Sequence, residues 1–292
     1  MKKAAVLLCL LASFACAQKR PAITGIAFVR MFTADPAAST AFYQGKLGFD
    51  RTAENGVARY AVSDSQWLEV APLPTPAPQS RIAAIAFTTR NAAALQSYLK
   101  AHSVAIDKPL HNGSFAVHDP EGQLVIFVQQ PAASSKEVSP HATARRIIHT
   151  GFWVHDRAAE DHFWRDILGF RPLWFGGQHD GEIDYVSSQV PDGTDWIEYM
   201  LNRSPNPNPH SLGSMNHFSL GVAQMSDAVQ ALARNGCSGP ECRKTQMGRD
   251  GKIQLNLFDP DLTRVEYMEF KPSGPICCSP FTGPPPAEQE NR

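Results

Sequence analysis

One structural unit recurs along this chain, and the recurrence restricts the fold more than any other feature. The segments Ile23–Phe49 (ITGIAFVRMFTADPAASTAFYQGKLGF) and Arg146–Phe170 (RIIHTGFWVHDRAAEDHFWRDILGF) share one outline. Each has an apolar strand-like run, an Asp, a short amphipathic stretch with an aromatic pair, and a closing Leu-Gly-Phe. Self-similarity of this kind indicates a chain built from tandem supersecondary units.

Other motifs follow the same repeat. His118–Val128 and Phe258–Met268 are Asp-Pro turns that lead into strands. Trp67–Val70, Trp196–Met200 and Arg264–Met268 are strand-like segments that carry a Glu. The Gly of each Leu-Gly-Phe is suited to end a helix. Each unit is therefore expected to contain a strand, a helix and about three further strands.

Pro-rich segments separate the units. Proline cannot donate to a β-ladder, so Ala71–Ser80 and Asn202–Ser214 are expected to be extended connectors. Pro131–Ala144 divides the chain into an N-terminal domain at 18–135 and a C-terminal domain at 145–271. Four units result, near residues 22–71, 81–130, 146–201 and 215–270. The Pro-rich tail at 272–292 is expected to be disordered.

Composition and charge agree with two globular domains. The chain has 292 residues, of which 43% are apolar and 19% charged, enough to bury a core in each half. The net charge is −1 and the sequence contains no basic run, so nucleic acid is not an expected partner. A small molecule is the expected partner, and the chain is expected to be a monomer or a weak homodimer.

The first residues have the pattern of a signal peptide at 1–17. Two lysines precede the apolar segment Ala4–Ala15, which is too short to span a bilayer, and Ala15-Cys16-Ala17 is a small-x-small cleavage site. The protein is expected to be exported, with no membrane insertion. A lipid anchor at Cys16 is the alternative.

Four cysteines remain after such a cleavage. Cys237 and Cys242 flank a short Gly- and Pro-containing loop and are a disulfide candidate. Cys277 and Cys278 are adjacent and are expected to bond poorly to each other. The absence of a second pair with zinc-ligand spacing favours disulfides or free thiols over a cysteine zinc site.

These motifs resemble those of the vicinal oxygen chelate superfamily, which includes glyoxalase I, extradiol dioxygenases and bleomycin resistance proteins. The resemblance rests on the helix that ends in Leu-Gly-Phe and on the Asp-Pro turn before a Glu-bearing strand, and it covers nearly the whole chain after residue 17. It implies an α+β fold in which four βαβββ modules pair into two half-open eight-stranded barrels. In this family a metal lies inside a barrel, held by the first and last strands of the modules.

The family's ligand positions in the second half are His149, Glu198, His217 and Glu266. In both modules the Glu follows the His by 49 residues (149 to 198 and 217 to 266), as a pseudo-two-fold site requires. The corresponding residues of the first half are Phe28, Glu69, Ala84 and Ile126. The resemblance therefore implies a metal site in the second barrel and a degenerate one in the first.

Imidazole and carboxylate groups suit a divalent first-row metal. Gly151 and Ser219, two residues after the histidines, leave space beside an ion. Buried charges without a partner would be strongly destabilising, which favours a ligand role for the set over a structural one. One divalent ion is expected, and the donor set admits Ni, Zn, Co, Mn or Fe.

Glu198 bears on the reaction class. It lies where extradiol dioxygenases have a catalytic His, and Asn256 lies where they have a Tyr. A His-Glu-His-Glu set instead resembles glyoxalase I, which implies proton transfer of the isomerase, epimerase or lyase type, with Glu198 or Glu266 as the catalytic base. An extradiol-type dioxygenase and a non-catalytic binding protein of the bleomycin-resistance type are the alternatives. The candidate substrate-binding residues are Asn256, Trp153 and Tyr199.

Overall fold

The computed structural model describes residues 19–130 and 138–288 of the chain. The predicted signal peptide, including Cys16, lies outside these residues, and so does the middle of the linker between the halves. None of the helices within the described ranges is long and apolar enough to span a membrane.

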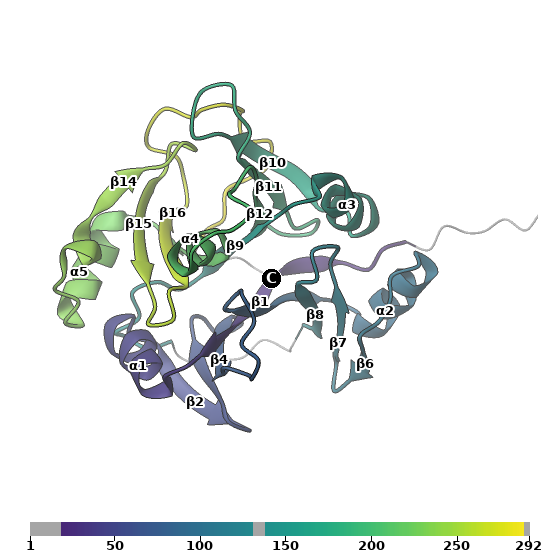
Figure 1. The fold of residues 1–292 in the computed structure, drawn as a ribbon, viewed down its shortest axis with the longest axis horizontal. Coiled ribbons are helices and arrows are strands. Elements are labelled where there is room, and N and C mark those ends of the chain that lie inside the picture. The colour runs from purple at the N-terminus through teal and green to yellow at the C-terminus, as the bar shows by residue number, and fades with distance from the viewer. Residues whose placement is uncertain (1–18, 131–137, 289–292) are drawn as a thin grey trace, which may run out of the picture.

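Two eight-stranded sheets form the framework, one from each half of the chain (Figure 1). The first contains β1 (Ile23–Thr33), β2 (Asp50–Glu54), β3 (Val57–Ala61), β4 (Trp67–Pro72), β5 (Ile82–Thr89), β6 (Lys108–His111), β7 (Ser114–His118) and β8 (Leu124–Gln129). The second contains β9 (Ile147–Trp153), β10 (Arg171–Gly176), β11 (Tyr185–Gln189), β12 (Trp196–Met200), β13 (His217–Val222), β14 (Thr245–Met247), β15 (Ile253–Phe258) and β16 (Arg264–Glu269).

Short helices connect the strands, and several of them lie on the outer side of the sheets (Figure 1). They are α1 (Pro36–Thr40) with the π-helical turn η1 (Ala41–Lys46), α2 (Ala92–Ala101), α3 (Arg157–Asp161) with the π-helical turn η2 (His162–Ile167), α4 (Pro209–Met215), α5 (Met225–Arg234) and the 3₁₀ turn η3 (Pro240–Arg243). The α4 helix lies in a connector that we expected to be extended, so that expectation was wrong for these residues.

The strand order is the same in both sheets. The first sheet runs β2-β3-β4-β1-β5-β8-β7-β6, and the second runs β10-β11-β12-β9-β13-β16-β15-β14. In each sheet the first strands of two modules pair antiparallel at the centre, and each pairs in parallel with the last strand of its own module. The predicted α+β fold of four βαβββ modules in two half-open barrels is confirmed.

Local sequence explains why the recurring helices begin and end where they do. The Asp35 carboxylate accepts hydrogen bonds from the amides of Ala37 and Ala38, as an N-cap does, and in the third module the Asp156 carboxylate accepts one from the amide of Ala159. Gly48 and Gly169 have φ angles of 74° and 76°, a left-handed conformation that costs glycine least. The repeated Leu-Gly-Phe is thus a helix stop.

Equivalent contacts join the two domains at two places. The Tyr43 hydroxyl of the first module donates to Asp259 Oδ2 of the fourth (2.7 Å). The Glu121 amide of the second module donates to Glu160 Oε1 of the third (3.1 Å). Asp-Pro turns therefore pack on the aromatic-bearing helices of the opposite domain, which explains why both motifs recur together.

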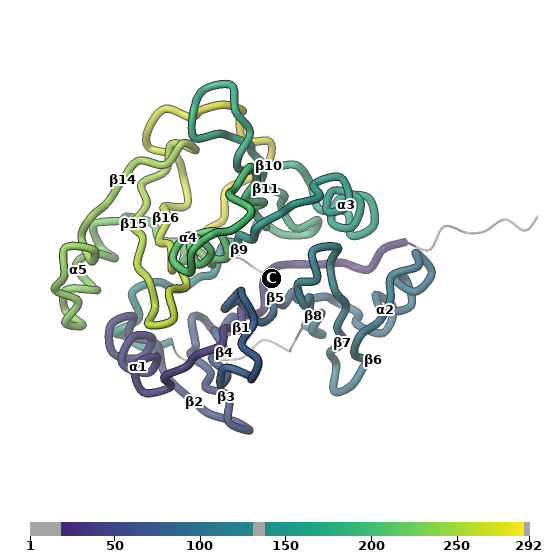
Figure 2. The backbone as a smooth tube through the Cα atoms, viewed as in Figure 1, coloured from purple at the N-terminus to yellow at the C-terminus, as the bar shows by residue number. Residues whose placement is uncertain are grey.

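The described part of the Pro-rich tail, residues 272–288, is ordered, contrary to the expectation from its composition. Residues 272–287, which we call the strap, run along the opening of the second barrel (yellow in Figure 2). The Thr282 amide donates to Leu173 O (3.0 Å), and Gln189 Nε2 donates to Pro284 O (2.9 Å). Polar groups of β10 and β11 and the apolar surface of the barrel hold this segment in place.

Two disulfides occur in the described chain. Cys237 and Cys242 are bonded, as predicted. Cys277 and Cys278 are also bonded to each other, contrary to the expectation that these neighbours would bond poorly. The second disulfide lies within the strap.

Candidate metal centre

The four predicted ligands lie on the central strands of the second sheet. Alternation along β9 places His149, Gly151 and Trp153 on one face. The register sets Trp196 beside His149 and Glu198 beside Gly151 on one side. The other central strands, β13 and β16, carry His217 and Glu266 onto the same face.

Three of the four converge. His149 Nε2 lies 3.1 Å from His217 Nε2 and 3.1 Å from Glu266 Oε2. One ligand atom from each of these residues lies within 4.8 Å of the others, and all three side chains are buried. Donors held ~2.1 Å from one ion in neighbouring positions lie ~3.0–3.4 Å apart, so these spacings suit one small divalent ion.

The tautomer and position of His217 also suit an ion. Its Nδ1 is 3.0 Å from Met215 O, so the Nδ1–H donates to this carbonyl and leaves a lone pair on Nε2. A Cβ atom at Gly151 would overlap the His217 ring. The space that Gly151 leaves beside His149 is therefore occupied by the His217 imidazole.

Glu198 stands apart from the three. Its Oε2 lies 3.8 Å from His217 Nε2, its Oε1 accepts from the Ser187 hydroxyl (3.4 Å), and its side chain is 13% exposed. It is not part of the convergent group. Burial raises the pKa of the Glu198 carboxyl. The site therefore has three close donors and one adjacent acid.

Arg264 is a site residue that we did not identify from the sequence. Its Nη2 donates to His217 Nε2 (2.8 Å), and its Nη1 lies 3.7 Å from Glu266 Oε1. An ion held by His217 Nε2 would replace the first of these contacts. The available signal was its place two residues before Glu266, on the same strand face.

Arg264 also shapes the electrostatics of the two ligands. Burial, and next the Arg264 charge, hold the pKa of His217 well below its usual value, so the imidazole is neutral as a ligand must be. Burial alone would raise the pKa of Glu266, but Arg264 and His149 hold it below its usual range. Both ligands are therefore in the protonation state that a cation needs.

A cavity of about 190 Å³ opens beside the centre. Glu198, Arg264 and Glu266 lie in its wall with other residues of the barrel mouth, which are Trp174, Tyr185, Met200, Gln246, Met247, Gly248, Arg249, Asp250, Gln254 and Met268. The lining is largely polar and includes two guanidinium groups. A small polar molecule can thus reach Glu266 and Glu198 from this side.

The three candidate substrate-binding residues lie in different surroundings. Asn256 pairs with Glu266 and shares its strand face, and its buried Oδ1 has no hydrogen-bond partner among the described residues. Trp153 is half-buried at the end of β9, and its ring contacts that of His155 in a tilted arrangement (centroids 4.0 Å apart) rather than lining the cavity. Tyr199 faces the opposite side of β12, in the core against Phe152. The expectation for Tyr199 was wrong, because a residue next to Glu198 in a strand faces away from it.

The first barrel has no such centre in its described part. Phe28, Ala84 and Ile126 take the register positions of His149, His217 and Glu266. Glu69 remains, but the guanidinium groups of Arg30 (2.6 Å) and Arg59 (2.9 Å) pair with it. In the first barrel, arginine side chains neutralise the buried carboxylate, whereas in the second barrel an ion would neutralise the carboxylate of the site.

The sequence matches the family model described as Glyoxalase/Bleomycin resistance protein/Dioxygenase superfamily over residues 25–127 and 146–267. No curated protein matches the sequence significantly. Solved structures with a similar fold include a catechol 2,3-dioxygenase, with a TM-score of 0.66 and 13% identity, over 88% of this chain and 96% of that one.

Two further similar structures are described as 2,3-dioxygenases. The 2,3-dioxygenase LapB from Pseudomonas sp. KL28 has a TM-score of 0.62 and 15% identity, over 90% of this chain and 97% of that one. A variant of homoprotocatechuate 2,3-dioxygenase from B. fuscum has a TM-score of 0.65 and 18% identity, over 89% and 76%. At these identities the likeness is one of fold. With both halves matched by the family model, the chain belongs to the Glyoxalase/Bleomycin resistance protein/Dioxygenase superfamily.

Proposed function

We propose that the second barrel is the active site of a metal-dependent enzyme acting on a small molecule that chelates through adjacent oxygens. His149, His217 and Glu266 hold one divalent ion, and Glu198 moves a proton on the bound substrate. Three donors converge (two imidazoles and one carboxylate), and a second carboxylate, Glu198, stands apart from them. This separation carries the proposal, because it divides the site into a ligand set and an acid–base group.

When bound, the ion would supply Lewis acidity for a developing negative charge. The chain's own groups supply the rest. Glu198 Oε2 is near enough to the ligand atoms to reach a proton on a chelating substrate. Arg264, in the cavity wall, can bind a negatively charged oxygen of the substrate. Asn256 Oδ1, which has no hydrogen-bond partner among the described residues, can accept a hydrogen bond.

Two reaction classes fit this arrangement. Two histidines and one carboxylate with open positions are typical of non-haem iron(II) oxygenases, which favours a ring-cleaving dioxygenase. Glu198 favours metal-assisted isomerisation or lyase chemistry, because a desolvated carboxylate beside a metal-bound substrate is suited to be a general base. The first class needs molecular oxygen and the second does not.

The test combines elemental analysis with turnover under air and under argon. The protein is reconstituted separately with Fe(II), Mn(II), Ni(II) and Zn(II), and supplied with catechol or with a methylglyoxal–thiol hemithioacetal as probes. Oxygen uptake with catechol, lost under argon, supports the dioxygenase. Turnover of the hemithioacetal under argon supports the isomerase.

The matched variants are Glu266→Gln and Glu198→Gln, which make the same change at a proposed ligand and at the proposed acid–base group. Glu266→Gln should lose the ion, whereas Glu198→Gln should keep it and lose turnover. One ion per chain retained in both Glu266→Gln and His149→Ala would contradict the ligand assignment. A wild-type protein that binds no ion stoichiometrically would leave only the binding-protein alternative.

We further propose that the chain is exported, on the basis of the residue pattern at 1–17. Expression of the full sequence in a bacterial host, followed by fractionation and N-terminal sequencing, tests this. A periplasmic or secreted protein that begins at Gln18 is the expected result. A lipid-modified Cys16 at the new terminus would support the anchor, and an uncleaved cytoplasmic chain would contradict both.

A further inference from the structure

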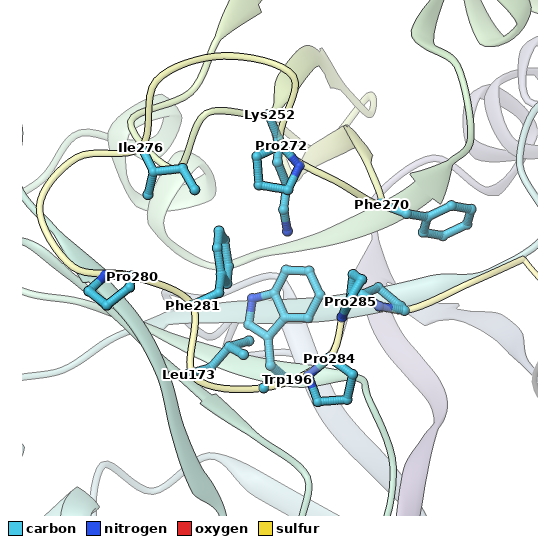
Figure 3. Close-up of a pocket in the computed structure, with 12 residues that line it drawn as sticks. Leu173, Trp196, Lys252, Phe270, Pro272, Ile276, Pro280, Phe281, Pro284 and Pro285 are labelled. Atoms are coloured by element: carbon cyan, nitrogen blue, oxygen red, sulfur yellow. The ribbon is translucent and has the colours of Figure 1, made fainter.

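A second cavity, of about 380 Å³, lies between the second barrel and the strap (Figure 3). The strap side is apolar and includes Ile276, Phe281 and several prolines, and the barrel side includes Leu173, Trp196 and Phe270. The volume is within the range of small-molecule sites. Among the residues that line the cavity, Lys252 is the only charged one.

The Lys252 ammonium lies inside this apolar space. Its side chain is 2% exposed, and Figure 3 shows it reaching between Trp196 and the strap. The Nζ atom is 4.5 Å from the Trp196 ring centroid and 4.8 Å from that of Phe281. These aromatic faces stabilise a cation without accepting a conventional hydrogen bond.

The protein leaves donors of this ammonium unused. Asp250 Oδ2 lies 3.7 Å from Nζ, beyond hydrogen-bond distance, and the other polar contact is with Met268 Sδ at 3.7 Å. Within the described residues no oxygen accepts a hydrogen bond from Nζ. An ammonium has three donors, and a buried one is strongly stabilised by an acceptor.

We propose that this cavity binds a small apolar carboxylate. The hydrocarbon body lies between Trp196 and Phe281, and the carboxylate accepts a charge-assisted hydrogen bond from Lys252 Nζ. The Asp250 carboxylate already lies on one side of the ammonium, and the remaining donors are available to the ligand. The apolar lining offers no other charged partner for the ligand's head group.

This site is distinct from the proposed metal centre but adjoins it. None of the four predicted metal ligands lines the cavity. Trp196, which does, stacks on the His149 imidazole with ring centroids 4.8 Å apart. Binding at Lys252 can therefore be measured without the ion, and it does not depend on the proposed reaction.

Isothermal titration calorimetry on the full chain tests the proposal, with 2-naphthoate as the probe and its neutral amide, 2-naphthamide, as the comparison. The titrations are made on chelator-treated and on metal-loaded protein. We expect 2-naphthoate to bind at least tenfold more tightly than the amide in both forms. Lys252→Met should weaken the binding of 2-naphthoate at least tenfold, to the affinity of the amide. Lys244→Met, at an exposed position, should leave both affinities unchanged.

Two further variants locate the probe and guard against a folding defect in Lys252→Met. Phe281→Ala should weaken the binding of both probes and keep the preference for the carboxylate, because it removes contact with the apolar body and leaves Lys252 with the Trp196 ring facing its ammonium. Arg264→Met should leave binding unchanged. Equal binding of both probes, or no binding of either, would overturn the assignment. So would a result in which Arg264→Met loses binding and Lys252→Met keeps it, because that would place the carboxylate at the metal-side cavity.

Discussion

Gly151 lies directly opposite His217 across the central strand pair, and the hydrogen atom at its Cα leaves the space in which the imidazole lies. Gly151→Ala should displace the His217 ring. Because Nε2 then leaves the position facing His149, the affinity for the ion should fall at least ~10-fold, as changes that misorient a ligand do. Competition with a chromophoric chelator measures this.

Gly45→Ala is the matched control for that substitution. Gly45 lies in the exposed turn η1, and a Cβ atom there meets no other atom within 4 Å. The change should leave metal affinity unaltered and raise stability slightly, since alanine has the better helix propensity. Equal affinities for wild type and Gly151→Ala would show that His217 is not a ligand.

The charge cluster of the first barrel should be needed for its stability. Glu69 is 1% exposed, and Arg30 Nε donates to its Oε2 (2.7 Å). Arg30→Met should lower the free energy of unfolding by about 1–3 kcal/mol, because a buried carboxylate loses one of its charged donors. Exposed Arg51→Met should change it little, and urea denaturation compares the two. A similar loss in both variants would contradict this role for Arg30.

Buried carboxyl groups at the domain interface should make stability depend on pH. Burial raises the pKa of Asp119 to about 7 and that of Glu160 to about 8. In the unfolded chain these carboxyl groups have pKa values of ~4. Because the folded-state values are higher, the stability that the protonated carboxyl groups contribute is fully present below pH 4 and is lost as the pH rises through 7 to 8. The free energy of unfolding should therefore fall between about pH 4 and pH 8.

Glu160→Gln should reduce that pH dependence. One linked proton accounts for at most ~1.4 kcal/mol per pH unit, and the slope between pH 6 and 8 should shrink by up to this amount. Asp166→Asn, at a 72% exposed position, is the control and should keep the wild-type slope. Denaturation curves at several pH values provide the measurement, and an unchanged slope in Glu160→Gln would exclude this carboxyl as the source.

The strap should be protected from solvent although its composition is typical of disorder. The amides of Cys277 and Thr282 donate to Arg249 O (2.9 Å) and Leu173 O (3.0 Å). Hydrogen exchange followed by mass spectrometry should show slow exchange at both. Gln189→Ala removes the contact with Pro284 and should speed exchange in the strap while β10 stays protected. Exchange at the rate of a free peptide in the wild type would mean that the strap is not bound.

The fold was predictable because its signals are local and occur repeatedly. N-caps such as Asp35 and Asp156, and helix stops such as Gly48 and Gly169, act within a few residues, so the sequence shows them directly. The equivalence of Phe28 to His149 follows from the same repeat, and the strand register agrees with it.

What escaped prediction depends on contacts between distant segments. Arg264 has a long side chain whose reach to His217 depends on the pairing of two strands, and its place two residues before Glu266 indicates only its strand face. The order of the strap comes from its fit to the barrel opening, which composition does not describe. Tyr199 is a different case, because strict alternation from Glu198 already places it in the core.

In the first barrel the counter-charge is part of the chain, because Arg30 stands at the register position that Gly151 holds in the second. The contribution of this guanidinium to stability does not depend on the concentration of any solute, because it is covalently attached. An ion taken from solution contributes to folding only in proportion to the logarithm of its concentration over its dissociation constant. Under the proposed function, chelation should loosen the C-terminal half selectively, so two halves built on one plan respond differently to the ionic composition around them.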